Sequence, residues 1–272
     1  MTTPILREST FKSISALMYE SIGLVLADSK RSLVTSRLGP RLQRLGLSSY
    51  DEYVALIEGE SGAAEFQMAV DFLTTNETYF FREPQHYDLL ERHIIAQRSR
   101  DPLAVWSAAS SFGDEAYSIA ILLSDLQKKG QCHSGWTILG TDISHRVLVS
   151  AKEAVFPVDR FRHVSPERMR NYCLRGEGPA DGQVMLQRKL RDRVQFGQLN
   201  LCRPFPNIGS FDVIFLRNVL IYFDNETRKT VIQNVLECLR PGGLFFVGTA
   251  EGRIQGMEKL VPLITGAFRK PL

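Results

Sequence analysis

The sequence predicts an α/β protein in which a helical unit precedes a parallel sheet, and a small antiparallel insertion interrupts that sheet. Three observations support this fold class. Residues 8 to about 80 carry apolar side chains at helical spacing, the chain from residue 103 alternates short apolar runs with helical stretches, and residues 157–193 combine turn formers with two apolar patches. Strands that alternate with helices are typical of a parallel sheet covered by helices on both faces.

The helical unit is predicted over residues 1–80. Phe11, Ile14, Met18 and Ile22 recur at intervals of three and four, which places them on one face of a helix, and no strand-like alternation is present.

A basic stripe is predicted further along this unit, opposite an apolar face formed by Leu38, Leu42 and Leu45. Its members are spaced at seven, four and three residues: Lys30, Arg37, Arg41 and Arg44. The stripe is either a solvated face or a docking surface for an acidic partner. Gly39-Pro40 is expected to kink or break the helix here.

Residues 81–102 are predicted to form a linker and cap segment, followed by a sheet domain over residues 103–272. Its strands are expected at five apolar runs: 103–109, 136–142, 194–200, 211–218 and 243–250. A last run, 261–268, leaves no room for a crossover helix, so we expect it to return antiparallel.

An insertion is predicted between the second and third strands, at residues 157–193. It contains a cluster of turn formers: Gly176, Gly178, Pro179, Asp181 and Gly182. Turn formers between two apolar patches indicate a hairpin or a small antiparallel β subdomain.

Composition limits the functional classes. The chain has 272 residues, 44% of them hydrophobic, which suffices for one large α/β core and a smaller unit. Lys and Arg number 33 against 30 Asp and Glu, so no whole-molecule positive field indicates a nucleic-acid partner. A local basic face would still attract an acidic partner.

The four cysteines lie far apart and form no CxxC or Cys/His cluster, so neither a disulfide framework nor a zinc site is predicted. The N-terminus lacks a leader pattern, and no apolar run approaches the roughly 20 residues of a membrane helix. We expect a soluble cytoplasmic protein without membrane insertion.

The loop after the first strand is a candidate ligand site, because ligands bind at the carboxyl ends of strands in open α/β sheets. It runs from Ala108 to Glu115 and contains one glycine, Gly113, so it is not the GxGxxG loop that cradles a pyrophosphate. The alternative is a plain strand-to-helix turn with Asp114 and Glu115 at the helix N-terminus.

Polar residues also end two other strands. Asp142 ends the second strand, where a carboxylate can accept hydrogen bonds from ribose hydroxyls, although it can equally be a helix N-cap. Arg217 and Asn218 end the strand at 211–218, and Tyr222 follows. Together these positions favour an adenosine-containing ligand without a pyrophosphate.

Five motifs resemble those of the CheR-type chemotaxis receptor glutamate methyltransferases, in the order that this family has them. They are LTTNETYFFREPQHYDLL (73–90), WSAASSFGDEAYSIA (106–120), GTDISHRVLVSAK (140–152), RNVLIYFD (217–224) and LRPGGLFFVGTAE (239–251). The resemblance covers nearly the whole chain and implies a Rossmann-like S-adenosylmethionine-dependent methyltransferase sheet.

The resemblance also implies the cofactor, S-adenosylmethionine, its product S-adenosylhomocysteine, and no metal. The implied cofactor-binding residues come from the linker and the strand ends: Asn76, Thr78, Arg82, Glu115, Asp142, Asn200, Leu201, Arg217 and Asn218. Of these, Glu115 and Asp142 are expected to hold the amino-acid and ribose portions. Arg82 and Tyr222 are expected closest to the reacting methyl group and the target carboxylate.

The implied substrates are glutamate side chains in the cytoplasmic domains of methyl-accepting chemotaxis receptors, methylated for sensory adaptation at membrane receptor arrays. The basic stripe then becomes a docking surface, and Arg175 with its glycine turn resembles relatives that bind a receptor C-terminal peptide at a sheet edge. Met185 stands where some of these relatives have arginine, so both modes, with and without this tether, stay open.

Two other functional classes remain. One is a binding or regulatory module that keeps the cofactor pocket without transfer activity, and the other is a methyltransferase for a small molecule or nucleic acid. Intact Arg82, Asn218 and Tyr222 argue against the first. The near-neutral charge and the lack of an aromatic-basic stripe argue against nucleic acid.

Overall fold

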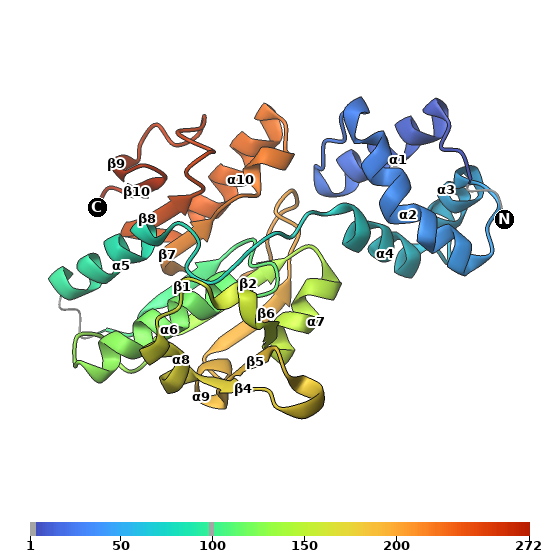
Figure 1. The fold of residues 1–272 in the computed structure, drawn as a ribbon. Coiled ribbons are helices and arrows are strands. Elements are labelled where there is room, and N and C mark those ends of the chain that lie inside the picture. Colours follow the sequence, from blue (N-terminus) through green and yellow to red (C-terminus); the bar gives the residue numbers. More distant parts are fainter. Residues whose placement is uncertain (1–3, 98–100) are drawn as a thin grey trace.

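The structure, a computed structural model, describes residues 4–97 and 101–272. Its N-terminal part is a group of helices that lies to one side of the sheet (Figure 1). These helices are α1 (Glu8–Ile22), α2 (Arg31–Leu45), α3 (Tyr50–Glu58) and α4 (Ala63–Leu73). Phe11, Ile14, Met18 and Ile22 are all buried in the core of this group, as the helical spacing predicts.

Helix α2 does not break at Gly39-Pro40. It runs from Arg31 to Leu45 with Pro40 inside it. Leu38 is fully buried and Gly39 is buried next to the Tyr50 hydroxyl, so packing offsets the one backbone hydrogen bond that a proline removes. Leu45, by contrast, is exposed and does not belong to the apolar face.

The main sheet has seven strands in the order β6-β2-β1-β7-β8-β10-β9. The five predicted runs form its parallel part: β1 (Ala104–Ser107), β2 (Thr137–Asp142), β6 (Val194–Gln198), β7 (Phe211–Leu216) and β8 (Leu239–Val247). The last run is a hairpin rather than one strand. Its second arm, β10 (Ala267–Arg269), is antiparallel to β8, and its first arm, β9 (Val261–Ile264), forms the edge.

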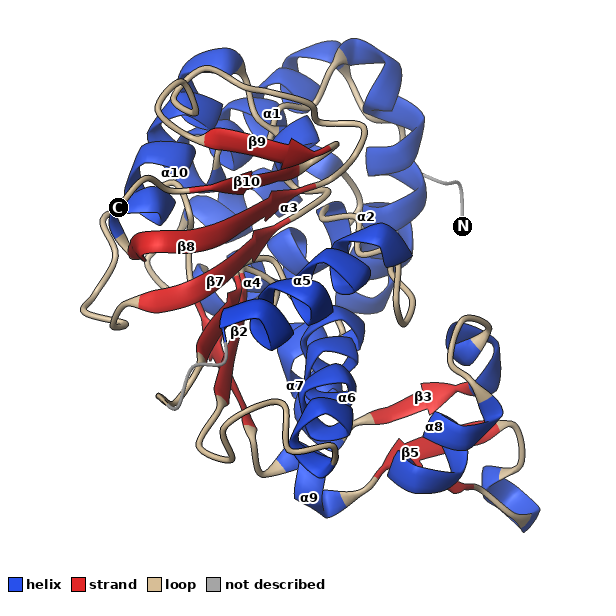
Figure 2. Ribbon diagram, turned by 90° about the vertical axis from the view of Figure 1, so that its left-hand side faces the viewer, coloured by secondary structure: helices blue, strands red, loops and turns tan. Residues whose placement is uncertain are grey.

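Helices cover both faces of this sheet (Figure 2). They are α5 (Pro84–Gln97), α6 (Asp114–Lys128), α7 (His145–Glu153) and α10 (Asn225–Glu237). Helix α5 lies where only a linker and cap were expected, and it packs Tyr87, Leu90 and Ile94 into the same core as α6. Residues 74–83, between α4 and α5, contain no helix or strand.

The insertion forms a separate three-stranded antiparallel sheet in the order β3-β5-β4, which confirms the predicted subdomain (Figure 2). Its elements are β3 (Val155–Pro157), α8 (Pro166–Tyr172), β4 (Cys173–Arg175), β5 (Gln183–Leu186) and α9 (Arg188–Arg191). Phe156 and Phe161 of this insertion pack against Phe80 of the linker, at ring distances of 5.0 and 4.1 Å.

Candidate functional site

A cavity with about 990 Å³ of space, open to solvent, lies between the carboxyl ends of the strands and the linker after α4. All ten residues predicted for the cofactor and the reaction line it: Asn76, Thr78, Arg82, Glu115, Asp142, Asn200, Leu201, Arg217, Asn218 and Tyr222. The chain thus brings together residues from segments far apart in sequence.

Asp142 lies in the cavity wall and does not cap a helix. Ser144 is the N-cap of α7, since its side chain accepts from the Val147 amide. The Asp142 carboxylate instead accepts hydrogen bonds from the amides of Ser111 and Ser144, each at 2.9 Å. Burial raises the pKa of Asp142 to about 6, against the lowering effect of these amides.

Glu115 also faces the cavity rather than capping its own helix. Helix α6 begins after Gly113, whose φ of 91° few other residues adopt. Glu115 accepts a hydrogen bond from the Ser107 hydroxyl at 2.7 Å and forms an ion pair with Arg217 at 3.1 Å. Its neighbour Asp114 points elsewhere, to Arg160. These contacts favour the ligand-loop interpretation over the plain turn.

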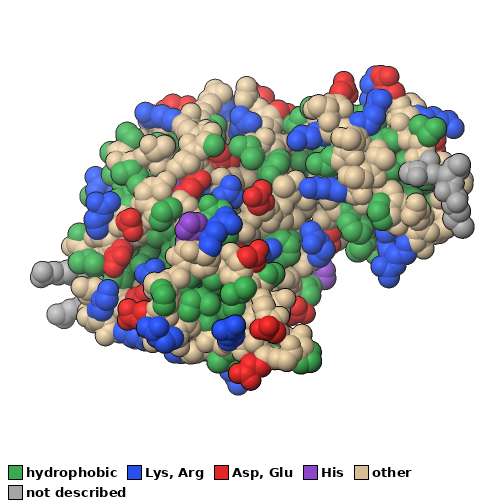
Figure 3. Space-filling model, viewed as in Figure 1, with side chains coloured by type: hydrophobic (Ala, Val, Ile, Leu, Met, Phe, Trp, Pro, Cys, Tyr) green, Lys and Arg blue, Asp and Glu red, His purple; other side chains and the backbone are tan. Residues whose placement is uncertain are grey.

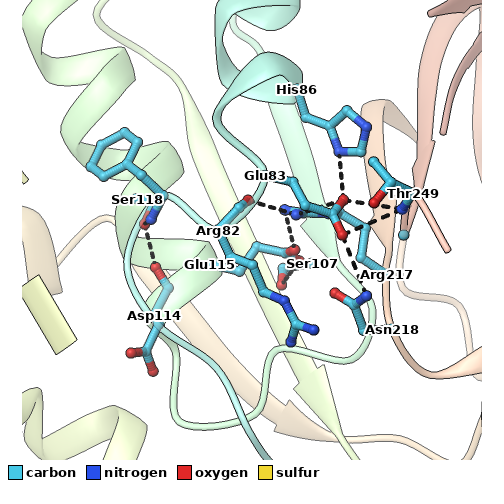
Figure 4. A network of polar contacts seen from close by, with 12 residues as sticks. Arg82, Glu83, His86, Ser107, Asp114, Glu115, Ser118, Arg217, Asn218 and Thr249 are labelled. Carbon is cyan, nitrogen blue, oxygen red and sulfur yellow. Dashed lines mark hydrogen bonds and ion pairs between the residues drawn. The ribbon is translucent and has the colours of Figure 1, made fainter. Parts of the chain in front are cut away.

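Arg217 is the centre of a buried polar network (Figure 4). Its guanidinium contacts Glu83 and Glu115, each at 3.1 Å, and donates to the Arg82 carbonyl at 2.6 Å. Two carboxylates therefore share one cation. Burial raises the pKa of Glu115 in spite of Arg217, whereas Arg217 and His86 outweigh burial at Glu83 and hold its pKa below the usual value.

Glu83 was missed by the sequence analysis. It has a φ of 58° directly before Pro84, a left-handed conformation that costs about 1–3 kcal/mol and must be held by its surroundings. Its carboxylate accepts from the Thr249 amide at 3.2 Å and lies 3.4 Å from the His86 ring. An acidic residue before the helix-starting proline was the available signal.

Glu251 was missed as well. Its carboxylate accepts hydrogen bonds from the amides of Asn218 at 2.9 Å, Leu220 at 2.8 Å and Gly248 at 2.6 Å. These bonds hold the short 3-10 helix Leu220–Tyr222 at the end of β7. Glu251 therefore fixes the turn that carries Tyr222 into the cavity wall.

The N-terminal helical group supplies part of the cavity wall, which was not predicted from the sequence. Ile22 and Leu24 line the cavity next to the strand ends. The Val25 amide donates to the Tyr222 carbonyl at 2.9 Å, and the Asn200 side chain donates to the Ser21 carbonyl at 2.8 Å. Apolar positions of this kind look like ordinary core in a sequence.

Arg82 points away from the Glu83–Arg217 network (Figure 4). Its guanidinium donates to the Glu77 carbonyl at 2.9 Å and lies 5.9 Å from the Tyr79 ring. Within residues 4–97 and 101–272 it forms no ion pair with a carboxylate. Its charge is therefore available to an anionic group that enters the cavity.

The predicted docking residues of α2 divide into two kinds. Arg37 donates to the carbonyls of Phe72, Leu73 and Thr74 at the end of α4, and Arg41 forms a bidentate pair with Glu65. These two arginines hold the helical group together.

The remaining two, Lys30 and Arg44, are exposed, and Lys30 belongs to a short 3-10 helix ahead of α2. The free basic surface is thus smaller than the stripe predicted from spacing.

Arg175 lies on β4, an edge strand whose one neighbour in the described sheet is β5. A shallow hollow beside it is lined by Val158, Met169, Arg170, Cys173, Arg175, Gly182, Gln183 and Val184. Leu174 and Met185 are exposed nearby, at 54% and 36%. An edge strand with exposed apolar side chains can accept an added peptide strand.

Two further features bear on the ligand. The Ser110 hydroxyl is buried in the cavity wall and lacks a hydrogen-bond partner in the described part of the chain. Glu115 shares its cationic partner, Arg217, with Glu83, so its carboxylate can accept a further cation such as an ammonium group. The cavity residues therefore fit a ligand that carries hydroxyls and a positive charge.

Over the same described residues, no cluster of His, Cys, Asp and Glu could hold a metal ion. None of the described helices combines the length and the apolar character needed to cross a membrane.

Comparison with known proteins identifies both parts of the chain. Residues 9–74 match the all-alpha domain of CheR methyltransferases, and residues 76–266 match their SAM binding domain. The chain is 39% identical over 247 residues to the chemotaxis protein methyltransferase of Salmonella typhimurium. The matched residues make up 90% of this chain and 84% of that protein. Chemotaxis protein methyltransferase 2 of Pseudomonas aeruginosa is 40% identical over 243 residues, covering 89% and 85%.

Proposed function

The chain belongs to the CheR methyltransferase family, and on this basis we propose that it methylates glutamate side chains of chemotaxis receptors with S-adenosylmethionine. The products are glutamate methyl esters and S-adenosylhomocysteine. The cavity supports this proposal, because the residues predicted for the cofactor and the reaction line it together and Arg82 has no carboxylate partner among the described residues.

Asp142 would accept hydrogen bonds from the ribose hydroxyls, and Glu115 would face the ammonium of the amino-acid portion. Asn200 and Leu201 would border the adenine. When bound, S-adenosylmethionine supplies a methyl group activated by a positively charged sulfur. The protein has to hold this donor and the acceptor in line, which in favourable cases contributes roughly 7–11 kcal/mol.

The acceptor needs no general base, because a glutamate with a pKa near 4.3 is already a carboxylate at neutral pH. Arg82 would orient this carboxylate by a charge-assisted contact, and Tyr222 would position the reacting groups without removing a proton. Asn76, Thr78 and Asn218 would close the remaining sides of the site.

Receptor docking completes the proposal. Lys30 and Arg44, the exposed members of the basic stripe, would meet acidic receptor helices. The free edge at β4, with Arg175, would bind a receptor C-terminal peptide where the receptor has one. Residues 1–80 would then act in docking, 81–102 as linker and cap, and 103–272 in transfer, in a cytoplasmic enzyme recruited to membrane receptor arrays.

The test combines Arg82→Ala with Tyr222→Phe. Titration calorimetry with S-adenosylhomocysteine and transfer of a tritiated methyl group to a receptor cytoplasmic fragment are measured on each protein. We expect Arg82→Ala to lower turnover by about 100-fold with little change in affinity, since it misplaces the acceptor rather than the cofactor. Tyr222→Phe should retain cofactor binding. Unchanged turnover in Arg82→Ala, or a product that is not a base-labile ester, contradicts the proposal.

A further inference from the structure

Unlike Arg160 and Arg168 in the same insertion, Arg162 forms no ion pair with a carboxylate of the described residues. Arg160 pairs with Asp114 at 3.1 Å, and Arg168 pairs with Asp125 at 2.7 Å. Arg162, which is exposed, forms no such pair within the described residues; its Nε lies 3.4 Å from the ring of His163. No carboxylate of the described residues neutralises the charge of Arg162.

Tyr79 holds Arg162 next to the cavity. The Arg162 guanidinium lies 3.9 Å above the centre of the Tyr79 ring, and the ring of His163 lies 5.3 Å from it. Tyr79 itself lines the cavity. A guanidinium stacked on an aromatic ring keeps its N–H groups available in the plane, which suits bidentate contact with a carboxylate.

Arg82, which also lines the cavity, lies 5.9 Å from the centre of the same ring. Two cations near one ring repel each other, so negative charge beside each of them is favoured electrostatically. The face that the linker crosses shows several Lys and Arg side chains in its central part (Figure 3). The arrangement provides one arginine for the acceptor carboxylate and a second one beside it.

We propose that Arg162, stacked on Tyr79, binds a second carboxylate of the receptor helix, one turn away from the glutamate that is methylated. This inference rests on the proposed function and adds a substrate requirement to it. Side chains three or four residues apart on a helix have Cβ atoms about 5–6 Å apart. Arg82 and Arg162 both lie at the Tyr79 ring, at 5.9 and 3.9 Å, so two carboxylates on one helix face would each meet an arginine there. Acceptor sites with an acidic neighbour on that face are therefore preferred.

The experiment is a double-mutant cycle between enzyme and substrate. Wild type and Arg162→Ala are assayed with two receptor cytoplasmic fragments, which carry Glu or Gln one helical turn from the acceptor. Arg188→Ala serves as the matched control, because Arg188 is an exposed arginine of the same insertion that pairs with Asp192 instead. Affinity for S-adenosylhomocysteine is measured in parallel.

We expect Arg162→Ala to raise KM for the Glu fragment about fivefold, as for an exposed charge pair, with kcat and cofactor affinity nearly unchanged. With the Gln fragment, wild type and variant should have the same KM, since the partner charge is gone. Arg162→Lys should restore part of the loss, and Arg188→Ala should behave as wild type.

Equal KM values for the Glu fragment, or an effect of Arg162→Ala that persists with the Gln fragment, overturn the inference. The proposed function itself is refuted by a different result: wild type that forms no methyl ester with either receptor fragment.

Discussion

Replacing Glu83 by glutamine tests whether the network around Arg217 holds the linker over the cavity. Glutamine has nearly the size of glutamate and keeps one acceptor oxygen. The substitution therefore removes mainly the negative charge that lies 3.1 Å from Arg217 and 3.4 Å from His86. Breaking a buried ion pair costs about 3–5 kcal/mol when the remaining charge is left alone. Arg217 keeps Glu115, so we expect a loss of about 2 kcal/mol, or roughly 4–8 °C in the unfolding midpoint.

The pH dependence has a defined sign. The pKa of Glu83 lies below its usual value in the folded protein, so its stabilising contribution is present above the pKa of the unfolded chain and is lost as the pH falls through the folded value. The difference between wild type and Glu83→Gln should therefore stay constant from neutral pH down to about pH 5 and close only below it.

Thermal unfolding followed by circular dichroism measures both effects. Asp192→Asn is the control, because it removes the charge from an exposed pair with Arg188 and should leave the midpoint unchanged. If Glu83→Gln melts at the wild-type temperature, Glu83 does not stabilise the folded linker through its charge, and the reasoning fails.

Two more predictions concern the cofactor site and the docking stripe. Since burial raises the pKa of Asp142 to about 6, affinity for S-adenosylhomocysteine should be constant above neutral pH and fall by up to about tenfold per pH unit well below 6. Asp142→Asn should bind more weakly and lose most of that slope in calorimetric titrations. Arg37→Ala should lower the free energy of unfolding by about 2 kcal/mol, because three carbonyls at the end of α4 lose their donor. Arg44→Ala should unfold at the wild-type temperature and weaken only receptor methylation.

The parallel strands were predictable because strands buried on both faces read as continuous apolar runs. The site was predictable for a related reason. Parallel strands end at one edge of the sheet, so polar residues that terminate β2 and β7 had to lie near each other, and the family motifs indicated which of them are expected to contact the cofactor.

Local sequence rules failed where tertiary packing decides. Gly39-Pro40 predicts an interruption, yet burial of Leu38 and Gly39 keeps α2 continuous. Helical spacing put Arg37 and Arg41 on a common face with Arg44, but spacing cannot show that the first two meet α4.

Glu83 and Glu251 were missed for another reason. Their roles depend on backbone amides brought in from other segments: Thr249 for Glu83, and Asn218 and Leu220 for Glu251. Contacts of this kind have no periodic signature, because they arise only when the linker and the loop after β8 meet at the end of β7.

The charged groups at the cavity form one connected network around Arg217. Arg217 contacts two carboxylates, those of Glu83 and Glu115, and its contacts with Glu83 and the Arg82 carbonyl tie it to the linker. Glu115 is the carboxylate left with the raised pKa, so it gains most from an added positive charge. A cationic ligand beside Glu115 would add a second positive charge next to this carboxylate, which shares Arg217 with Glu83, while Glu83 keeps Arg217 and the linker in place. Arg217 contacts both the Arg82 carbonyl and Glu115, so the proposed roles of Arg82 toward the acceptor and of Glu115 toward the donor both depend on this one arginine at the end of β7.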